Sequence, residues 1–110
     1  MGGKLPRRLS VVIPAYNENE IILETLKECI SSLNGAKPEI IVVDDGSLDG
    51  TLEKVQKFAT ENKNVKVVSY GGNHGKGHAV KYGFQQATGD IVAFIDADMN
   101  LHPRQIKTLL

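Results

Sequence analysis

Cysteine, tryptophan and a surplus of either charge are absent or nearly absent from this sequence. Cys29 is the single cysteine, which excludes an internal disulfide and fits a reducing compartment. The 13 basic and 13 acidic residues give a formal net charge of zero, so no overall charge draws the chain to nucleic acid. Without tryptophan and with only 3 tyrosines, the chain also offers no aromatic platform for single-stranded bases.

Long hydrophobic runs are missing as well. The strongly apolar stretches are as short as residues 91–95, whereas a helix that spans a bilayer needs about 20 apolar residues. Residues 2–8 contain two glycines, a lysine and two arginines, which is too polar for a signal peptide. We therefore expect a cytoplasmic chain whose partners do not include nucleic acid.

What remains is the composition of one ordinary globular domain. The 110 residues are 41% hydrophobic and 24% charged, which is enough for a single core and argues against a disordered chain. We expect residues 1–8 to form a flexible N-terminal arm and residues 9–110 to form one domain, since no internal repeat or low-complexity linker interrupts them.

Four β-branched, apolar runs predict strands at residues 9–13, 39–43, 65–69 and 90–95. The second and fourth runs are apolar without alternation, which is typical of strands buried on both faces of a parallel sheet. The runs are separated by the length of chain that a strand–helix–strand crossover needs.

Apolar residues at helical spacing fill the intervals between these strands. The stripes cover residues 22–33, 52–59 and 79–87, Asp49 is placed to cap the second helix, and Pro103 opens a fourth. The pattern predicts the α/β class, with an open, mostly parallel, Rossmann-like sheet of strand order 3-2-1-4 and flanking helices. That order leaves the fourth strand at an edge, so we expect a C-terminal half or a second copy of the chain to cover it.

Polar residues follow all four predicted strands, at 14–18, 44–47, 71–77 and 96–100. In an open parallel sheet, ligands bind beyond the carboxyl ends of the strands, near the point where the strand order reverses. Any one of these stretches is explained by loop structure, but the four together at one edge predict a binding site.

Asp96 and Asp98 give the sharpest signal within this edge. In extended chain, residues two apart project to the same side, so the two carboxylates converge and repel unless a cation lies between them. Hard oxygen ligands favour Mg²⁺ or Mn²⁺, and these ions keep coordination positions open for phosphates. The structural alternative is an Asx-turn and a helix cap ahead of Pro103.

The other stretches are less specific. One of Asp44 and Asp45 is expected to brace the loop or cap the next helix, which leaves the other free to accept hydrogen bonds from a base or sugar edge. The glycines of 71–77 allow close backbone approach, and Lys76 is placed to face a phosphate or to lie solvated in a flexible turn. Cys29 lies on an apolar stripe and is expected in the core.

Taken together, four ordered motifs resemble glycosyltransferase family 2, the inverting nucleotide-sugar transferases with a GT-A fold. They are VVIPAYNEN at 11–19, VVDDGSLDGT at 42–51, NHGKGHAVKYGFQQATGD at 73–90 and FIDADMNLHP at 94–103. The combination also resembles the polyprenyl-phosphate branch, meaning dolichyl-phosphate mannose or glucose synthases and their bacterial relatives. On this resemblance the chain is a truncated GT-A fold, the half that binds the nucleotide sugar.

The resemblance also implies roles for individual residues. The residues implied to bind the nucleotide sugar are Pro14, Ala15, Tyr16, Glu18, Asp44, Asp45, Lys76, Asp96 and Ala97. The residues implied to hold the metal are Asp96, Asp98 and Asn100. Family catalytic domains are much longer than this chain, and no residue here is assigned as the general base.

The implied activity is metal-dependent, inverting transfer of a hexose from a donor of the GDP-mannose or UDP-glucose type. The implied acceptor is a polyprenyl (dolichyl) phosphate, met at the cytoplasmic face of a membrane through segments outside this chain. Two alternatives are a non-catalytic nucleotide-binding module that works with a partner chain and a phosphatase of the haloacid dehalogenase type. In that phosphatase Asp96 would be the nucleophile, but Met99 and Asn100 stand where the motif normally continues with Gly-Thr.

Overall fold

A computed structural model describes residues 8–97, so the predicted helix that begins at Pro103 lies outside the described residues. The strands are β1 (Leu9–Ala15), β2 (Glu39–Asp44), β3 (Val65–Ser69) and β4 (Ile91–Phe94). The helices are α1 (Ile22–Ser32), the short 3₁₀ helix η1 (Asn34–Ala36), α2 (Thr51–Glu61) and α3 (Lys76–Gln86). None of the helices within 8–97 has the length and apolar character that crossing a bilayer requires.

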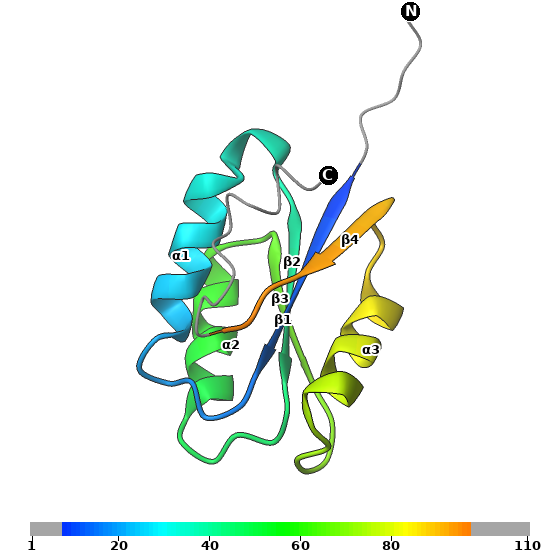
Figure 1. Cartoon of the computed structure of the whole chain (residues 1–110). Coiled ribbons are helices and arrows are strands. Elements are labelled where there is room, and N and C mark those ends of the chain that lie inside the picture. Colours follow the sequence, from blue (N-terminus) through cyan, green and yellow to red (C-terminus); the bar gives the residue numbers. More distant parts are fainter. Residues whose placement is uncertain (1–7, 98–110) are drawn as a thin grey trace, which may run out of the picture.

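The strands form one parallel sheet in the order β3-β2-β1-β4, which confirms the predicted topology. Helices α1 and α2 cover one face of the sheet and α3 covers the other (Figure 1). All three crossovers pass through a helix, as parallel strands require. The strands therefore begin at a common edge, called the amino edge below, and end at the opposite edge, called the carboxyl edge.

The hydrophobic core lies on both faces of the two central strands. Every residue of β1 and β2 is buried, and alternate side chains point to opposite faces: Val11 and Ile13 pack toward α1 and α2, whereas Val12 packs toward α3. Cys29 is fully buried on α1, as predicted, and burial raises the pKa of its thiol to about 12. This thiol is a core group with no reactive form at neutral pH.

Two local predictions differ from the structure. Helix α2 is capped by Gly50 with a positive φ of 90°, and Asp49 stands one residue earlier, where its Oδ1 accepts a hydrogen bond from the Thr51 N–H at 3.1 Å. Strand β4 is only partly buried and Phe94 is 43% exposed, because β4 lies at the edge of the described sheet and pairs there with β1 alone.

A buried carboxylate joins several segments at the amino edge. Oε1 of Glu39 accepts hydrogen bonds from the Ser10 hydroxyl at 2.7 Å and the Thr88 N–H at 2.9 Å, and Oε2 accepts one from Lys66 Nζ at 2.5 Å. Burial alone would raise the pKa of Glu39, but these hydrogen bonds favour the charged form more strongly and lower it to about 2.

This network predicts how stability depends on pH. Since the folded pKa of Glu39 lies below the ordinary value of 4.5, its contribution is complete above pH 4.5 and is lost as the pH falls toward 2. We expect Glu39→Gln to lower the free energy of unfolding at neutral pH by about 2 kcal/mol and to flatten its decline below pH 4.5. Urea titrations at a series of pH values measure both effects, and an unchanged slope would contradict the role assigned to this carboxylate.

Candidate functional site

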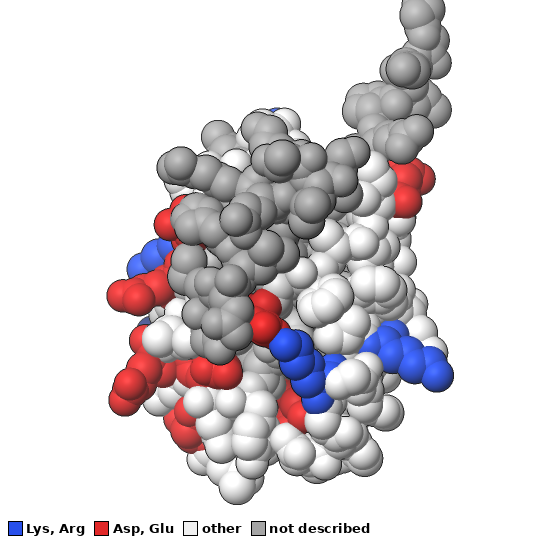
Figure 2. Space-filling model, in the orientation of Figure 1, with Lys and Arg blue, Asp and Glu red and all other residues white. Residues whose placement is uncertain are grey.

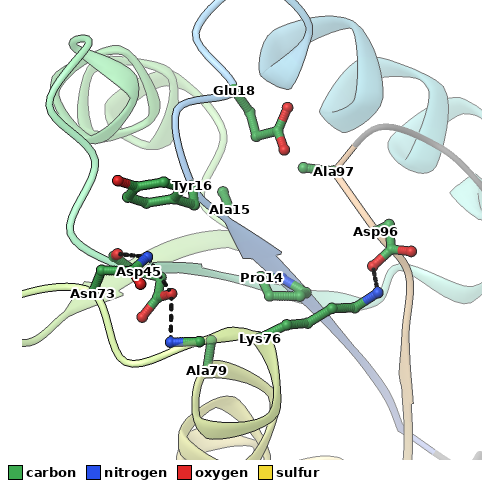
Figure 3. A pocket seen from close by; sticks show the side chains of 11 residues that line it. Pro14, Ala15, Tyr16, Glu18, Asp45, Asn73, Lys76, Ala79, Asp96 and Ala97 are labelled. Atoms are coloured by element: carbon green, nitrogen blue, oxygen red, sulfur yellow. Dashed lines mark hydrogen bonds and ion pairs between the residues drawn. The ribbon is translucent and has the colours of Figure 1, made fainter.

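A cavity of about 340 Å³ opens at the carboxyl edge, where the loops after all four strands converge (Figure 3). It lies at the point of the sheet where the strand order reverses between β1 and β4. Its walls are formed by Pro14, Ala15, Tyr16, Glu18, Asp45, Asn73, Gly75, Lys76, Ala79, Asp96 and Ala97.

The cavity contains every residue predicted to bind a nucleotide sugar except Asp44. Asp44 ends β2 with 2% of its surface exposed, and its Oδ2 accepts a hydrogen bond from the Ser47 N–H at 3.2 Å. Asp44 therefore braces the loop between β2 and α2, which is the structural role left open for one of the two aspartates. Gly75, one of the glycines expected to allow close backbone approach, lines the cavity as well, and so do Asn73 and Ala79, to which the sequence assigned no binding role.

Asp45 organises the glycine-rich loop that follows β3. Its Oδ1 accepts hydrogen bonds from the Tyr70 hydroxyl at 2.6 Å and the His74 N–H at 2.9 Å. Its Oδ2 accepts hydrogen bonds from the Asn73 side-chain amide at 2.9 Å and the Gly75 N–H at 3.0 Å. Asp45 is only 4% exposed; burial opposes its charge, but these hydrogen bonds outweigh burial and hold the pKa of the carboxyl below its usual range.

Tyr70 is the member of this arrangement that the sequence did not reveal. Its ring makes edge-to-face contacts with His74, His78 and Tyr82, at centroid distances of 5.1, 4.8 and 5.2 Å. Burial and the hydrogen bond to Asp45 raise the pKa of its hydroxyl, so this group stays a donor at any physiological pH. The position directly after a strand was the only signal that placed Tyr70 near the site.

Two glycines, Gly46 and Gly72, allow the loops after β2 and β3 to come into close backbone contact. Gly46 has a φ of 83°, and a Cβ at this position would come within 2.6 Å of the Gly72 carbonyl carbon. A residue with a side chain would strain the backbone and separate the loops, so glycine is needed here for two reasons. This close contact helps to fix Asp45 opposite its hydrogen-bond donors.

The loop after β1 is tied to the loop after β2 by side-chain to backbone hydrogen bonds. The Asn17 N–H donates to the Ser47 hydroxyl at 2.8 Å, and the Asn17 side-chain oxygen accepts from the Leu48 N–H at 2.8 Å. The Glu18 N–H donates to the Thr51 hydroxyl at 3.0 Å. These bonds hold Tyr16 and Glu18 on one wall of the cavity, with the ring of Tyr16 42% exposed.

A cation and an anion meet on the opposite wall. Lys76, the first residue of α3, forms an ion pair with Asp96, which follows β4, and Figure 3 shows the two side chains reaching toward each other. The next residue, Ala97, is held by its carbonyl, which accepts a hydrogen bond from the buried Thr25 hydroxyl at 2.6 Å. On the face shown in Figure 2, acidic side chains lie mainly at the lower left, toward the carboxyl edge.

Asp96 is the one predicted metal ligand among the described residues, because Asp98 and Asn100 lie outside them. Within residues 8–97 no group of three or more histidine, cysteine or acidic side chains is arranged to hold a metal ion. The carboxylate of Asp96 is a hard oxygen donor on the cavity wall, which suits Mg²⁺ or Mn²⁺ in chemical type. A complete ligand set would need donors from beyond residue 97.

The fold and the position of the cavity define the class of open, parallel α/β domains that bind ligands beyond the carboxyl ends of their strands. The chain belongs to glycosyl transferase family 2, whose family model matches residues 10–110. The family resemblance inferred from the four sequence motifs is thereby confirmed. The phosphatase alternative is not favoured by this membership.

Curated relatives and a solved structure agree with this assignment. The chain is 39% identical over 103 residues to a dolichol-phosphate mannosyltransferase of Pyrococcus furiosus, covering 94% of this chain and 29% of that relative. It is 40% identical over 109 residues to an undecaprenyl-phosphate 4-deoxy-4-formamido-L-arabinose transferase of Pectobacterium carotovorum, covering 94% of this chain and 33% of that relative. The chain thus spans a third or less of the length of these two proteins.

The solved structure confirms the GT-A type of fold. It is the mannosyltransferase PcManGT from Pyrobaculum calidifontis in complex with GDP-Man and Mn²⁺. The two structures have a TM-score of 0.77 at 34% sequence identity, and the match covers 86% of this chain and 28% of that one. At this similarity the neighbour supports the fold and its strand order.

Proposed function

We propose that the carboxyl-edge cavity binds the nucleotide-diphosphate sugar of a metal-dependent, inverting glycosyltransferase that transfers a hexose to a polyprenyl phosphate. The observation that carries this proposal is the cavity itself, since four sequence segments far apart in the chain meet in it with most of the predicted residues. Two relatives named for transfer to polyprenyl phosphates support the acceptor class. This acceptor would be met at the cytoplasmic face of a membrane.

The walls of the cavity suggest how a donor would lie in it. The half-exposed ring of Tyr16 offers a flat face to a nucleoside, and the N-terminus of α3, with Lys76, offers positive charge to a diphosphate. Asp45 has both oxygens occupied by the glycine-rich loop, so we assign it to holding that loop in place beside the nucleotide.

The metal is assigned to Asp96 together with Asp98 and Asn100. When bound, a divalent ion supplies Lewis-acid stabilisation to the negative charge that builds on the leaving diphosphate. Lys76, which pairs with Asp96 on the same wall of the cavity, would neutralise part of the same charge beside the metal. A lipid phosphate acceptor is anionic at neutral pH, so it attacks the anomeric carbon without first losing a proton to a general base.

A thermal-shift panel tests the donor site. We expect one of UDP, GDP, CDP and ADP to stabilise the chain only in the presence of Mn²⁺, by about 2.7 kcal/mol when the ligand is at about 100 times its Kd. Asp98→Ala should remove the effect because it takes away a metal ligand. Glu61→Gln is the matched control, because it removes one carboxylate at the exposed end of α2, and it should leave the stabilisation by nucleotide and Mn²⁺ intact. Equal stabilisation by all four nucleotides in the presence of a chelator would contradict the proposal.

A further inference from the structure

The amino edge of the sheet, opposite the donor cavity, collects positive charge. A cation stands just before each of three parallel strands: Arg8 before β1, Lys37 before β2 and Lys63 before β3. Because parallel strands begin at the same edge, these three residues are brought to the amino edge of the sheet, where the strands of Figure 1 begin. Lys66, the second residue of β3, joins them around a cavity of about 140 Å³.

The charge of this second cavity is unbalanced within the described residues. Its lining contains four cations and one carboxylate, Glu39, whose oxygens already accept hydrogen bonds from Ser10, Thr88 and Lys66. No ion pair within residues 8–97 involves Arg8, Lys37 or Lys63, and all three side chains are exposed. The whole chain has zero formal charge, so this local excess is a property of the edge and not of the composition.

The backbone holds these cations in place. The Arg8 N–H donates to Asp90 Oδ2 at 3.1 Å, and the Arg8 carbonyl accepts from the Asp90 N–H at 2.8 Å. Lys63 lies in a turn closed by a hydrogen bond from the Val65 N–H to the Asn62 carbonyl at 2.9 Å. Lys66 is fixed by its ion pair with Glu39.

Lys37 is in a backbone conformation that favours glycine. Its φ is 46°, in the turn that follows η1, and its N–H donates to the Leu33 carbonyl at 3.2 Å. A residue with a Cβ pays an energetic penalty in the left-handed region, and glycine does not. A lysine at this position therefore places a cation beside the cavity at the expense of local stability.

We propose that the amino-edge cavity binds a phosphate group, carried by a small phosphorylated molecule or by a lipid headgroup. A cavity of about 140 Å³ has room for a phosphate group, and the guanidinium of Arg8 and the ammonium groups of the three lysines are the donors that phosphate oxygens prefer. The site is separate from the donor cavity, since strands of five to seven residues place the two edges about 20 Å apart. It does not depend on the function proposed above.

An NMR titration of the chain with inorganic phosphate at constant ionic strength tests this site. We expect saturable shifts of the amides of Arg8, Lys37, Lys63 and Lys66, with those of Tyr16 unmoved. The double variant K37G/K63Q should bind phosphate about tenfold more weakly, because two charge-assisted contacts are lost. K81Q removes the same charge from an exposed position on α3 and is the matched control.

The single variant Lys37→Gly distinguishes a loss of phosphate binding from a loss of stability. Glycine relieves the left-handed backbone, so this variant should melt a few degrees higher than the parent chain while its affinity for phosphate falls several-fold. A variant that is more stable and yet binds less cannot owe its weaker binding to partial unfolding.

Vesicles distinguish the two sources of the phosphate group. Binding to phosphatidylglycerol vesicles but not to phosphatidylcholine vesicles, lost in K37G/K63Q and kept in K81Q, would assign the site to lipid headgroups. Saturable shifts with free phosphate and no vesicle binding would assign it to a small molecule. Shifts that do not saturate, or an equal loss of binding in K81Q and K37G/K63Q, would overturn the proposal in favour of non-specific charge attraction.

Discussion

Replacing Asp45 with asparagine is expected to lower the free energy of unfolding by about 3 kcal/mol and to abolish nucleotide binding. The carboxylate accepts four hydrogen bonds from the loop that follows β3, two on each oxygen. An asparagine in either orientation turns an N–H₂ group toward two of these donors, so at least two buried bonds are lost. The loop that carries Gly75 and Lys76 would then lose its attachment to β2.

Tyr70→Phe is the matched control for this prediction. It removes one of the donors and keeps the ring contacts with His74 and His78, so the expected loss is about 1 kcal/mol and nucleotide binding should survive. Urea denaturation and the thermal-shift panel measure the two effects. If Asp45→Asn were as stable as the parent chain and changed only the preference among nucleotides, Asp45 would be a base-reading residue and not a loop anchor.

The second large effect is expected at Gly83, where α3 lies closest to the sheet. A Cβ at this position would be 3.0 Å from a methyl group of Val43 and would collide with Val12, and both strand residues are fully buried. Gly83→Leu would force the helix away from β1 and β2, with a loss of about 3 kcal/mol and a fall in Tm of more than about 10 °C.

Gly77→Ala in the same helix is the control for Gly83→Leu. A Cβ at Gly77 meets no atom within 4 Å, and alanine favours the helix more than glycine does. This variant should therefore be as stable as the parent chain or slightly more stable. Calorimetry of the two variants gives the comparison, and similar Tm values for both would show that α3 shifts on the sheet without penalty.

The sequence was sufficient for the fold because the signals were repeated and independent. Strand periodicity, the lengths of the crossovers and the glycosyl transferase motifs all indicated an open parallel sheet, and the structure has the order 3-2-1-4 expected for one. Most residues predicted for the site line one cavity for a related reason, since parallel strands bring the loops after them to one edge. The metal site that includes Asp98 and Asn100 stays a prediction, as both residues lie outside those described.

The features that could not be predicted from the sequence are mostly ones set by loop conformation. The partners of Asp45 are set by the positive φ of Gly46 and Gly72, which bring the loops after β2 and β3 into contact, and no periodic pattern encodes that contact. The cap of α2 was misplaced by one residue because Gly50 takes a left-handed conformation. Burial of β4 was overestimated because its unbroken apolar run was interpreted as a strand covered on both faces, although the predicted strand order already placed it at an edge.

The position of β1 between β2 and β4 has a consequence for the chain as it leaves the ribosome. One side of β1 finds its neighbour soon after synthesis, but pairing on the other side joins Arg8 to Asp90, which is 82 positions later. At ordinary translation rates that side of a largely apolar strand waits several seconds with its backbone groups unpaired. The nascent chain is thus most exposed to misassociation just before β4 emerges, and this is the interval in which a chaperone would protect it most.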